Sequence, residues 1–133
     1  MHCICVDPDR VHLVWPLVKH LIHAAMNKGG GCDFAEMETS VLRGEKLLWV
    51  AADEAVIWAA VVTGLHVQQD HKFCMIWAAG GRDRPRWHDM MKSAIEKFAK
   101  DEGCKTIRIS GRRGWAREFP DYKLISILLE KAI

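Results

Sequence analysis

A turn that combines two glycines with three arginines follows an apolar segment in the stretch AAGGRDRPRWHDMM (residues 78–91). A strand, a glycine-containing turn and a helix start often bind anions, because unpaired backbone N–H groups and the positive end of the helix dipole meet there. Pro85 removes one backbone donor, and Trp87 places a large ring where close backbone approach requires a small residue. Two interpretations remain open: nothing binds an anion here, or arginine side chains do so in place of the backbone. The arginines concerned are Arg82, Arg84 and Arg86.

Arginines also dominate a second turn, GRRGWAR (residues 111–117), near the end of the sequence. Two glycines frame Arg112 and Arg113 and indicate a turn with special backbone angles. These arginines are interpreted as a solvated basic turn, as phosphate ligands, or as a docking patch for an acidic surface or nucleic acid. Trp115 adds a flat apolar surface of the kind that protein interfaces favour. Arginine interleaved with tryptophan over two short turns is only a weak indication of nucleic-acid binding.

Two groups of metal-ligating residue types lack the partners that a site requires. Cys3 and Cys5 share one face of a predicted strand, but no second ligand pair follows at a usable spacing. His20 and His23 lie one helical turn apart, and a site there needs a third ligand from elsewhere. The sequence therefore predicts small buried thiols, solvent-facing histidines and no metal.

The bulk composition indicates a soluble protein built as one domain, residues 1–133. Half of the residues are apolar, 27% are charged and the net charge is +2, so the composition does not demand a nucleic-acid partner. The longest apolar runs are too short to span a membrane, and no leader with a cleavage site is evident. The five cysteines are odd in number and lack a disulfide framework, which indicates free thiols and a reducing, cytoplasmic location.

Hydrophobic periodicity and turn residues predict the elements that position these residues. Pro16 either kinks the first helix or marks its true start. The strand, helix and strand between residues 71 and 110 form a right-handed crossover, so the two strands are parallel. The prediction is an α/β fold in the order β-α-α-β-β-β-α-β-α-β, with a mixed sheet of about six strands and helices on both faces. Strands are predicted over 3–6, 46–52, 55–67, 71–79, 105–110 and 122–129, and helices over 11–26, 33–42, 87–99 and 114–119.

This order of elements, in a chain of this length, resembles the GNAT acetyltransferase superfamily. The segment IRISGRRGWAREFPDY (residues 107–122) is similar to a GRxGWxR segment of small GNAT-like proteins encoded by tailed phages and prophages. The resemblance implies a V-shaped split between the fourth and fifth strands that binds acetyl-CoA, with the pyrophosphate on the loop after the fourth strand. The cofactor-binding residues that it implies are Trp77, Ala78, Ala79, Gly80, Gly81, Arg82, Arg84, Arg86, Arg112 and Arg113.

The residues expected from this family are absent at three places. The family loop Q/R-x-x-G-x-G/A has Pro85 and Trp87 at its small positions, and the fourth strand lacks a carboxylate. The short helix after the fifth strand lacks the tyrosine that commonly protonates the CoA thiolate. Substitutes are Glu54, His66, His71 and Glu118 as bases, and Tyr122 or Cys74 as acids, with Glu54, His71 and Tyr122 preferred.

Two functions follow with equal weight. One is an acyl-CoA-dependent N-acetyltransferase that acts on an amine and has a divergent pyrophosphate loop. The other is a non-catalytic GNAT-like module that binds a protein partner or forms oligomers, for instance as a component of a phage virion or in contact with the host. The missing loop glycines and the six tryptophans motivate the second.

Overall fold

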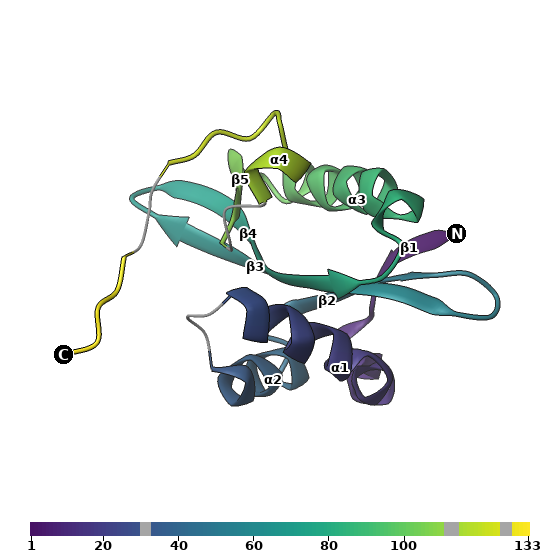
Figure 1. Ribbon diagram of the computed structural model, residues 1–133. Coiled ribbons are helices and arrows are strands. Elements are labelled where there is room, and N and C mark those ends of the chain that lie inside the picture. Colours follow the sequence, from purple (N-terminus) through teal and green to yellow (C-terminus); the bar gives the residue numbers. More distant parts are fainter. Residues whose placement is uncertain (30–32, 111–114, 126–128) are drawn as a thin grey trace.

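The computed structural model describes residues 1–29, 33–110, 115–125 and 129–133 and centres on one mixed β-sheet (Figure 1). Its five strands lie in chain order. The first three neighbouring pairs are antiparallel, and β4 and β5 are parallel. The strands are β1 (His2–Cys5), β2 (Leu47–Ala52), β3 (Ile57–Gln68), β4 (His71–Gly81) and β5 (Thr106–Ile109). The helices are α1 (Val11–Gly29), α2 (Phe34–Leu42), α3 (His88–Asp101) and α4 (Trp115–Glu118), with 3-10 turns η1 (Pro8–Arg10) and η2 (Arg84–Arg86).

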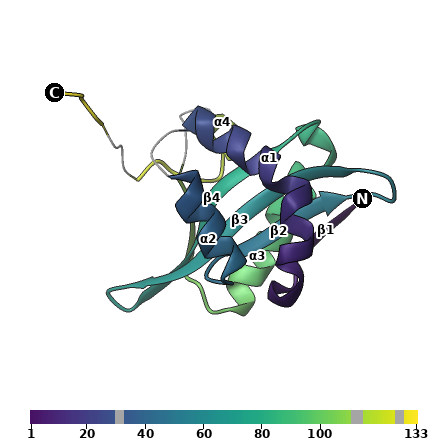
Figure 2. The ribbon, with the colours of Figure 1, turned by 90° about the horizontal axis from the view of Figure 1, so that it is seen from below.

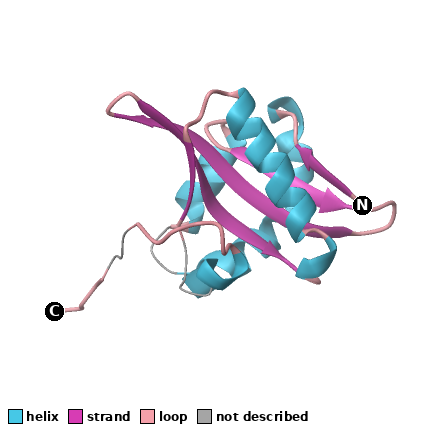
Figure 3. Ribbon diagram, turned by 90° about the horizontal axis from the view of Figure 1, so that it is seen from above, coloured by secondary structure: helices cyan, strands magenta, loops and turns pink. Residues whose placement is uncertain are grey.

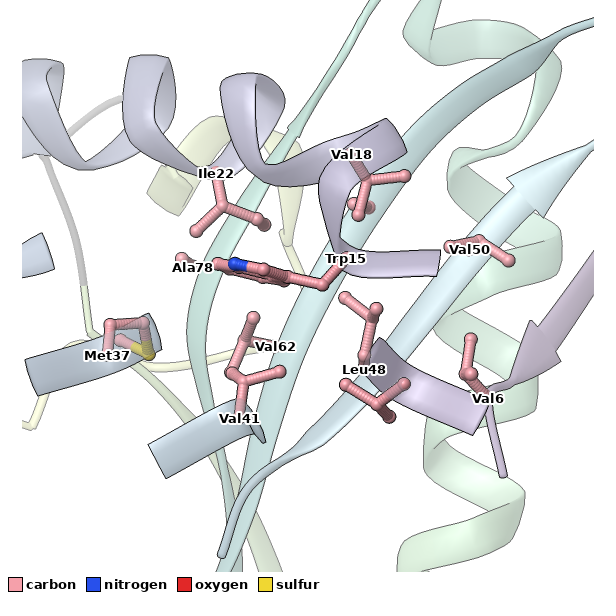
Figure 4. Packing of buried hydrophobic residues seen from close by; sticks show 12 residues of the cluster. Val6, Trp15, Val18, Ile22, Met37, Val41, Leu48, Val50, Val62 and Ala78 are labelled. Carbon is pink, nitrogen blue, oxygen red and sulfur yellow. The ribbon is translucent and has the colours of Figure 1, made fainter. Parts of the chain in front are cut away.

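Helices cover both faces of the sheet, as the sequence predicts. Helices α1 and α2 pack on one face, and α3 and α4 lie on the other (Figures 1 and 3). Two separate apolar cores result. Trp15, Val18 and Ile22 of α1 pack against β2 and β3 in the first core (Figure 4), and Met91 and Ile95 of α3 fill the second. Each fully buried Val, Leu or Ile contributes roughly 1.5–3 kcal/mol, so the cores hold the helices to the sheet.

A side-chain cap starts α2, and α1 runs through its proline. Asp33 accepts a hydrogen bond from the N–H of Ala35 at 3.0 Å and caps α2, as predicted. Helix α1 begins at Val11 and continues through Pro16, so the alternative that Pro16 marks the start of the helix is wrong. Pro16 lies on the exposed side of α1, where water can hydrate the carbonyl that loses its helical partner.

The β3–β4 hairpin closes with two left-handed residues. Gln69 and Asp70 have φ values of 51° and 63°, and Gln68 pairs with His71 on either side of them. Two central residues with positive φ form a type I′ turn, whose twist matches that of the flanking strands. Neither residue is glycine, so the hairpin pays a steric penalty at its tip.

A β-bulge interrupts β4 at the point where its pairing with β5 ends. Val62 of β3 pairs with Ala78, whereas its neighbour Thr63 pairs with Ile76, so Trp77 is an extra residue on β4. Ile76 is also the last residue of β4 that pairs with β5. Strand β5 ends at Ile109, so the end of β4 beyond the bulge pairs with β3 alone among the described residues. The edge of β4 that faces away from β3 beyond Ile76 is called the split below.

The sheet has five strands rather than six, because no strand forms in the described part of the predicted segment 122–129. Tyr122 donates its N–H to the carbonyl of Phe119 at 3.0 Å in a turn, and its side chain lies against α3. Leu124 and Ile125 are exposed, as is Leu129. Residues 126–128 lie outside the described residues.

Candidate cofactor site and active site

The end of β4 presents backbone donors toward the split. The N–H of Arg82 donates to the carbonyl of Trp58 on β3 at 3.0 Å. Since N–H groups alternate in direction along an antiparallel strand, those of Gly81 and Ala79 point the other way, toward the side that β5 has left. The bulge thus places two backbone donors along the split, which a ligand can use.

The two glycines of AAGG lie inside β4 and serve its packing. A Cβ atom on Gly80 would lie 2.2 Å from the carbonyl oxygen of Leu21 in α1, and one on Gly81 would lie 2.5 Å from the carbonyl oxygen of Trp58. Both separations are far below van der Waals contact. The sequence analysis interpreted these glycines as part of a phosphate-binding turn. Close packing of β4 against α1 and β3 also explains why both positions are glycine. The connecting turn itself runs from Arg82 to Trp87.

The first turn of α3 offers donors without a side-chain cap. Trp87 occupies the N-cap position, and no side-chain oxygen of the described residues caps the helix there. The N–H groups of His88, Asp89 and Met90 have no partner within the helix, because the first intrahelical bonds begin further along. The indole of Trp87 is buried and donates to the carbonyl of Arg82 at 2.9 Å. The ring that the sequence suggested would obstruct an anion is therefore folded into the core.

Two of the three arginines in the turn lie over one tryptophan. The guanidinium carbon atoms of Arg82 and Arg86 lie 5.0 and 4.6 Å from the ring centroid of Trp58, which is cation–π geometry. Arg86 also pairs with Asp83 at 3.1 Å. The turn thus holds two positive charges beside the start of α3. Arg112 and Arg113 lie outside the described residues.

Arg84 extends in another direction, toward α4. Its Nη1 atom lies 3.5 Å from Oε1 of Glu118, and both side chains are partly exposed. An ion pair of this kind contributes at most about 1 kcal/mol.

Asp53 is a residue that sequence reasoning missed. Its carboxylate accepts hydrogen bonds from the Trp58 indole at 2.8 Å and from the N–H groups of Ala55 and Val56. These bonds, that of Trp58 foremost, lower the pKa of Asp53 to about 2. Asp53 fixes the β2–β3 turn and orients the ring on which the arginines lie. Its signal in the sequence was an Asx-type turn, DEAV, which predicts the turn but not the indole contact.

The predicted catalytic residues Glu54 and His71 lie at opposite ends of the sheet. Glu54 is exposed on the β2–β3 turn and lines an open hollow of about 400 Å³ beside the chain's first two residues. His71 lies at the tip of the β3–β4 hairpin, with its Nε2 atom 2.8 Å from Oγ1 of Thr106. Six residues separate His71 from the bulge at Trp77, which is about 20 Å along a strand. The structure does not bring Glu54 and His71 together.

Tyr122, the third of the preferred catalytic residues, packs against α3. Its hydroxyl donates to Oε2 of Glu96 on α3 at 2.7 Å, and it packs against Phe119. Burial and then the bond to Glu96 raise the pKa of Tyr122 above its ordinary value, with a smaller effect from nearby Cys74 on β4. The phenol therefore stays protonated at neutral pH. Burial raises the pKa of the Cys74 thiol to about 12, which makes Cys74 a poor proton donor.

His66 contacts the bulge directly. The indole N–H of Trp77 donates to Nε2 of His66 at 3.2 Å, and the two rings fit because Gly64 lacks a side chain beneath them. Burial and then the charge of Lys46 lower the pKa of His66. A neutral imidazole that accepts at Nε2 carries its proton on Nδ1. His66 can therefore accept a substrate proton only after its bond to Trp77 breaks.

No protein-family model matches the sequence, and no curated protein resembles it in sequence. Solved structures do resemble it. An aminoglycoside acetyltransferase from an uncultured soil metagenomic sample superposes with a TM-score of 0.70 at 11% identity, over 99% of this chain and 95% of that one. The fold is that of the GNAT acetyltransferases.

Two further GNAT-type structures support this assignment. A GNAT family acetyltransferase from Staphylococcus aureus has a TM-score of 0.67 at 12% identity and covers 99% of this chain and 98% of its own. A ribosomal-protein-alanine N-acetyltransferase from Brucella melitensis biovar Abortus has a TM-score of 0.66 at 8% identity, with coverage of 99% and 96%. The predicted GNAT-like fold is confirmed. The phage or prophage origin stays a prediction.

The described residues contain neither a metal-binding group of side chains nor a helix that could span a membrane. Within the ranges that the structure describes, no three His, Cys, Asp or Glu side chains gather as a metal site would require. Cys3 and Cys5 are half-buried free thiols on β1, and burial raises the pKa of each. No helix among the described residues has the length and apolar character that crossing a membrane requires.

Proposed function

We propose that this protein is an acyl-CoA-dependent N-acetyltransferase whose split between β4 and β5 holds the cofactor. The observation that carries the proposal is the bulge at Trp77, because it opens the split and directs it toward the first turn of α3. Bound acetyl-CoA would supply an activated acyl thioester to an amine. The donors of Gly81 and the α3 N-terminus suit the negative charge of a pyrophosphate.

In the family loop, backbone N–H groups hold the pyrophosphate. In this chain, the arginines of the turn would supply positive charge in their place. Arg82 and Arg86 are held on the Trp58 ring, and Arg84 forms an ion pair with Glu118. Guanidinium groups bind phosphate with two parallel hydrogen bonds. We therefore propose that arginine side chains and the α3 N-terminus together replace the family loop.

Tyr122 is the proposed proton donor to the leaving thiolate. Its raised pKa keeps the phenol protonated, and Glu96 orients it. Glu54 and His71 are too far apart to act together, and the lone pair of His66 is engaged by Trp77. The proposal leaves removal of the amine proton to solvent water.

Thermal protection by acetyl-CoA tests the proposal. A ligand at 100 times its Kd stabilises a fold by about 2.7 kcal/mol, so millimolar acetyl-CoA is expected to raise the Tm by several degrees. The double variant Arg82→Ala, Arg84→Ala should abolish this shift. Lys97→Ala removes an exposed charge from the far end of α3 and is the matched control. Absence of a Tm shift and of calorimetric binding at millimolar acetyl-CoA would contradict the proposal.

A second candidate is a protein-binding module, including one that functions in a phage assembly. Exposed apolar residues in the C-terminal segment favour it, because such residues gather at interaction sites. They are Leu124, Ile125, Leu129 and Ile133. Light scattering would detect an oligomer that Leu124→Ser and Ile125→Ser together dissociate. If the unmodified protein and the double variant are both monomers and both transfer acetyl groups to an amine, this candidate is excluded.

A further inference from the structure

A group of aromatic and basic side chains surrounds the bulge on the sheet face opposite α3. Ring contacts and cation contacts connect its members into one patch, which we call the bulge patch. The β3–β4 hairpin that carries most of it extends past α2 (Figure 2). The bulge patch comprises Lys46, His66, Phe73, Trp77 and Arg108.

Three rings form the floor of the bulge patch. The imidazole centroid of His66 lies 5.5 Å from the Phe73 ring and 5.5 Å from the Trp77 ring. The hydrogen bond from Trp77 to His66 fixes the order of the rings. His66 therefore lies at the centre of the floor, and Trp77, the residue that the bulge adds to β4, forms one end.

One cation lies at each end of this floor. The ammonium nitrogen of Lys46 is 5.3 Å from the Trp77 ring centroid, and the guanidinium carbon of Arg108 is 4.1 Å from that of Phe73. Alternation along β5 places Arg108 on this face, because its neighbours Ile107 and Ile109 pack toward α3. Lys46 is therefore held beside the bulge residue Trp77, and Arg108 is held over Phe73, at the other end of the floor.

Neither cation has a carboxylate partner within the described ranges. Arg108 donates only to the side-chain carbonyl of Gln68, at a long 3.4 Å, and Lys46 forms no ion pair there. The nearest acidic residue in sequence, Glu45, is exposed and lines a hollow on α2 instead. Positive charge at the patch is also evident from His66, whose pKa Lys46 helps to lower. The patch is thus electropositive and unneutralised in the described part of the chain.

We propose that the bulge patch is the acceptor side of the split and binds a small amine that also carries an acidic group, a carboxylate or a phosphate. This proposal rests on the proposed function, because the bulge at Trp77 is where β4 opens to both faces. The acidic group would bind to Arg108 at the Phe73 end of the aromatic floor, and the floor would pack against the carbon chain, with the amine toward Trp77. The Nδ1–H of His66 is a further donor to the anion. The two substrates would approach from opposite faces of the sheet.

Matched amines test the charge preference. With acetyl-CoA as donor, β-alanine is compared with 3-aminopropan-1-ol, and phosphoethanolamine with ethanolamine, so that the first pair reports on carboxylate and the second on phosphate. We expect at least one acidic amine to exceed its neutral partner in kcat/KM by tenfold or more, since a charged hydrogen bond is worth roughly that factor. Equal rates for both pairs would overturn the proposal while leaving the proposed function intact.

Substitutions of Arg108 and Lys46 test which cation produces the preference for acidic over neutral amines. Arg108→Gln should reduce this preference about tenfold, and Lys46→Gln, at the other end of the floor, should reduce it less, whereas Lys97→Ala should leave the preference unchanged. Circular dichroism and Tm identify any variant that fails to fold, in which case Arg108→Met or Lys46→Met, which keeps an aliphatic stem without the charge, replaces it. A preference that survives both Gln variants overturns the placement of the anion.

Binding without the cofactor separates the two proposals. The indole N–H resonance of Trp77 should shift on titration with phosphoethanolamine or β-alanine, and Arg108→Gln should abolish the shift. If this occurs while no amine is acetylated, the bulge patch is an anion site and the proposed function is wrong. If acetylation occurs without any shift at Trp77, the acceptor binds elsewhere and this inference is wrong.

Discussion

Replacing Gly80 by alanine separates a packing role of the AAGG segment from a cofactor role. The added Cβ would lie 2.2 Å from the carbonyl oxygen of Leu21 and 2.9 Å from its carbon, and both are backbone atoms that no rotamer change can move. Either β4 or α1 must shift by about 1 Å. Overpacking of this kind typically costs about 1–3 kcal/mol. For a chain of this size that is a fall in Tm of roughly 4–12 °C.

Urea unfolding, monitored by tryptophan fluorescence, measures this cost. The matched control is Gly103→Ala, because Gly103 has a φ of +80° but a Cβ there meets nothing within 4 Å. Its cost should be backbone strain alone, about 1–2 kcal/mol. If Gly80→Ala unfolds within 0.5 kcal/mol of the unmodified protein and yet loses acetyl-CoA binding, the glycine serves the cofactor and our packing argument is refuted.

Three further predictions concern the hairpin, the proposed proton donor and the β2–β3 turn. Asp70→Gly should stabilise the protein by up to about 1 kcal/mol in urea unfolding, because Asp70 has a φ of 63°; a loss of stability would contradict the turn geometry. Tyr122→Phe should lower kcat about a hundredfold with the KM for acetyl-CoA unchanged, and an unaltered kcat would remove Tyr122 from the mechanism. The pKa of Asp53 falls from 3.8 to about 2 on folding, so its contribution is present above pH 3.8 and is lost as the pH falls toward 2. The stability difference between the protein and Asp53→Asn should therefore shrink over that window, and a difference independent of pH would argue against the bonds to Asp53.

Elements with strong periodicity could be predicted from the sequence, whereas pairing details could not. The apolar stripe from Trp87 through Met91 and Ile95 predicts α3. Met91 and Ile95 are both buried, as expected. The bulge at Trp77 depends on which residue of β3 lies opposite, and a single sequence does not contain that register. The segment from Tyr122 has the apolar pattern of a strand, but its tyrosine packs on α3 through Glu96, a contact 26 residues away in sequence.

In the candidate site too, some features could be predicted from the sequence and others could not. The position of the arginine turn before α3 follows from the order of elements, and its residues could be named in advance. The orientation of the Trp87 ring could not be predicted. The ring turns into the core and donates to the carbonyl of Arg82. The glycines of AAGG suggested a phosphate loop, although close contacts with α1 and β3 account for both. Residue type alone does not distinguish a glycine needed for a ligand from one needed for packing.

Amide chemical shifts during an acetyl-CoA titration test the central claim most directly. If the split and the α3 N-terminus hold the cofactor, the resonances of Gly81 and of His88, Asp89 and Met90 should move in a saturable manner. Those of α2, on the opposite face, should stay in place. The absence of shifts at millimolar acetyl-CoA, or shifts confined to residues away from the split, would contradict the account.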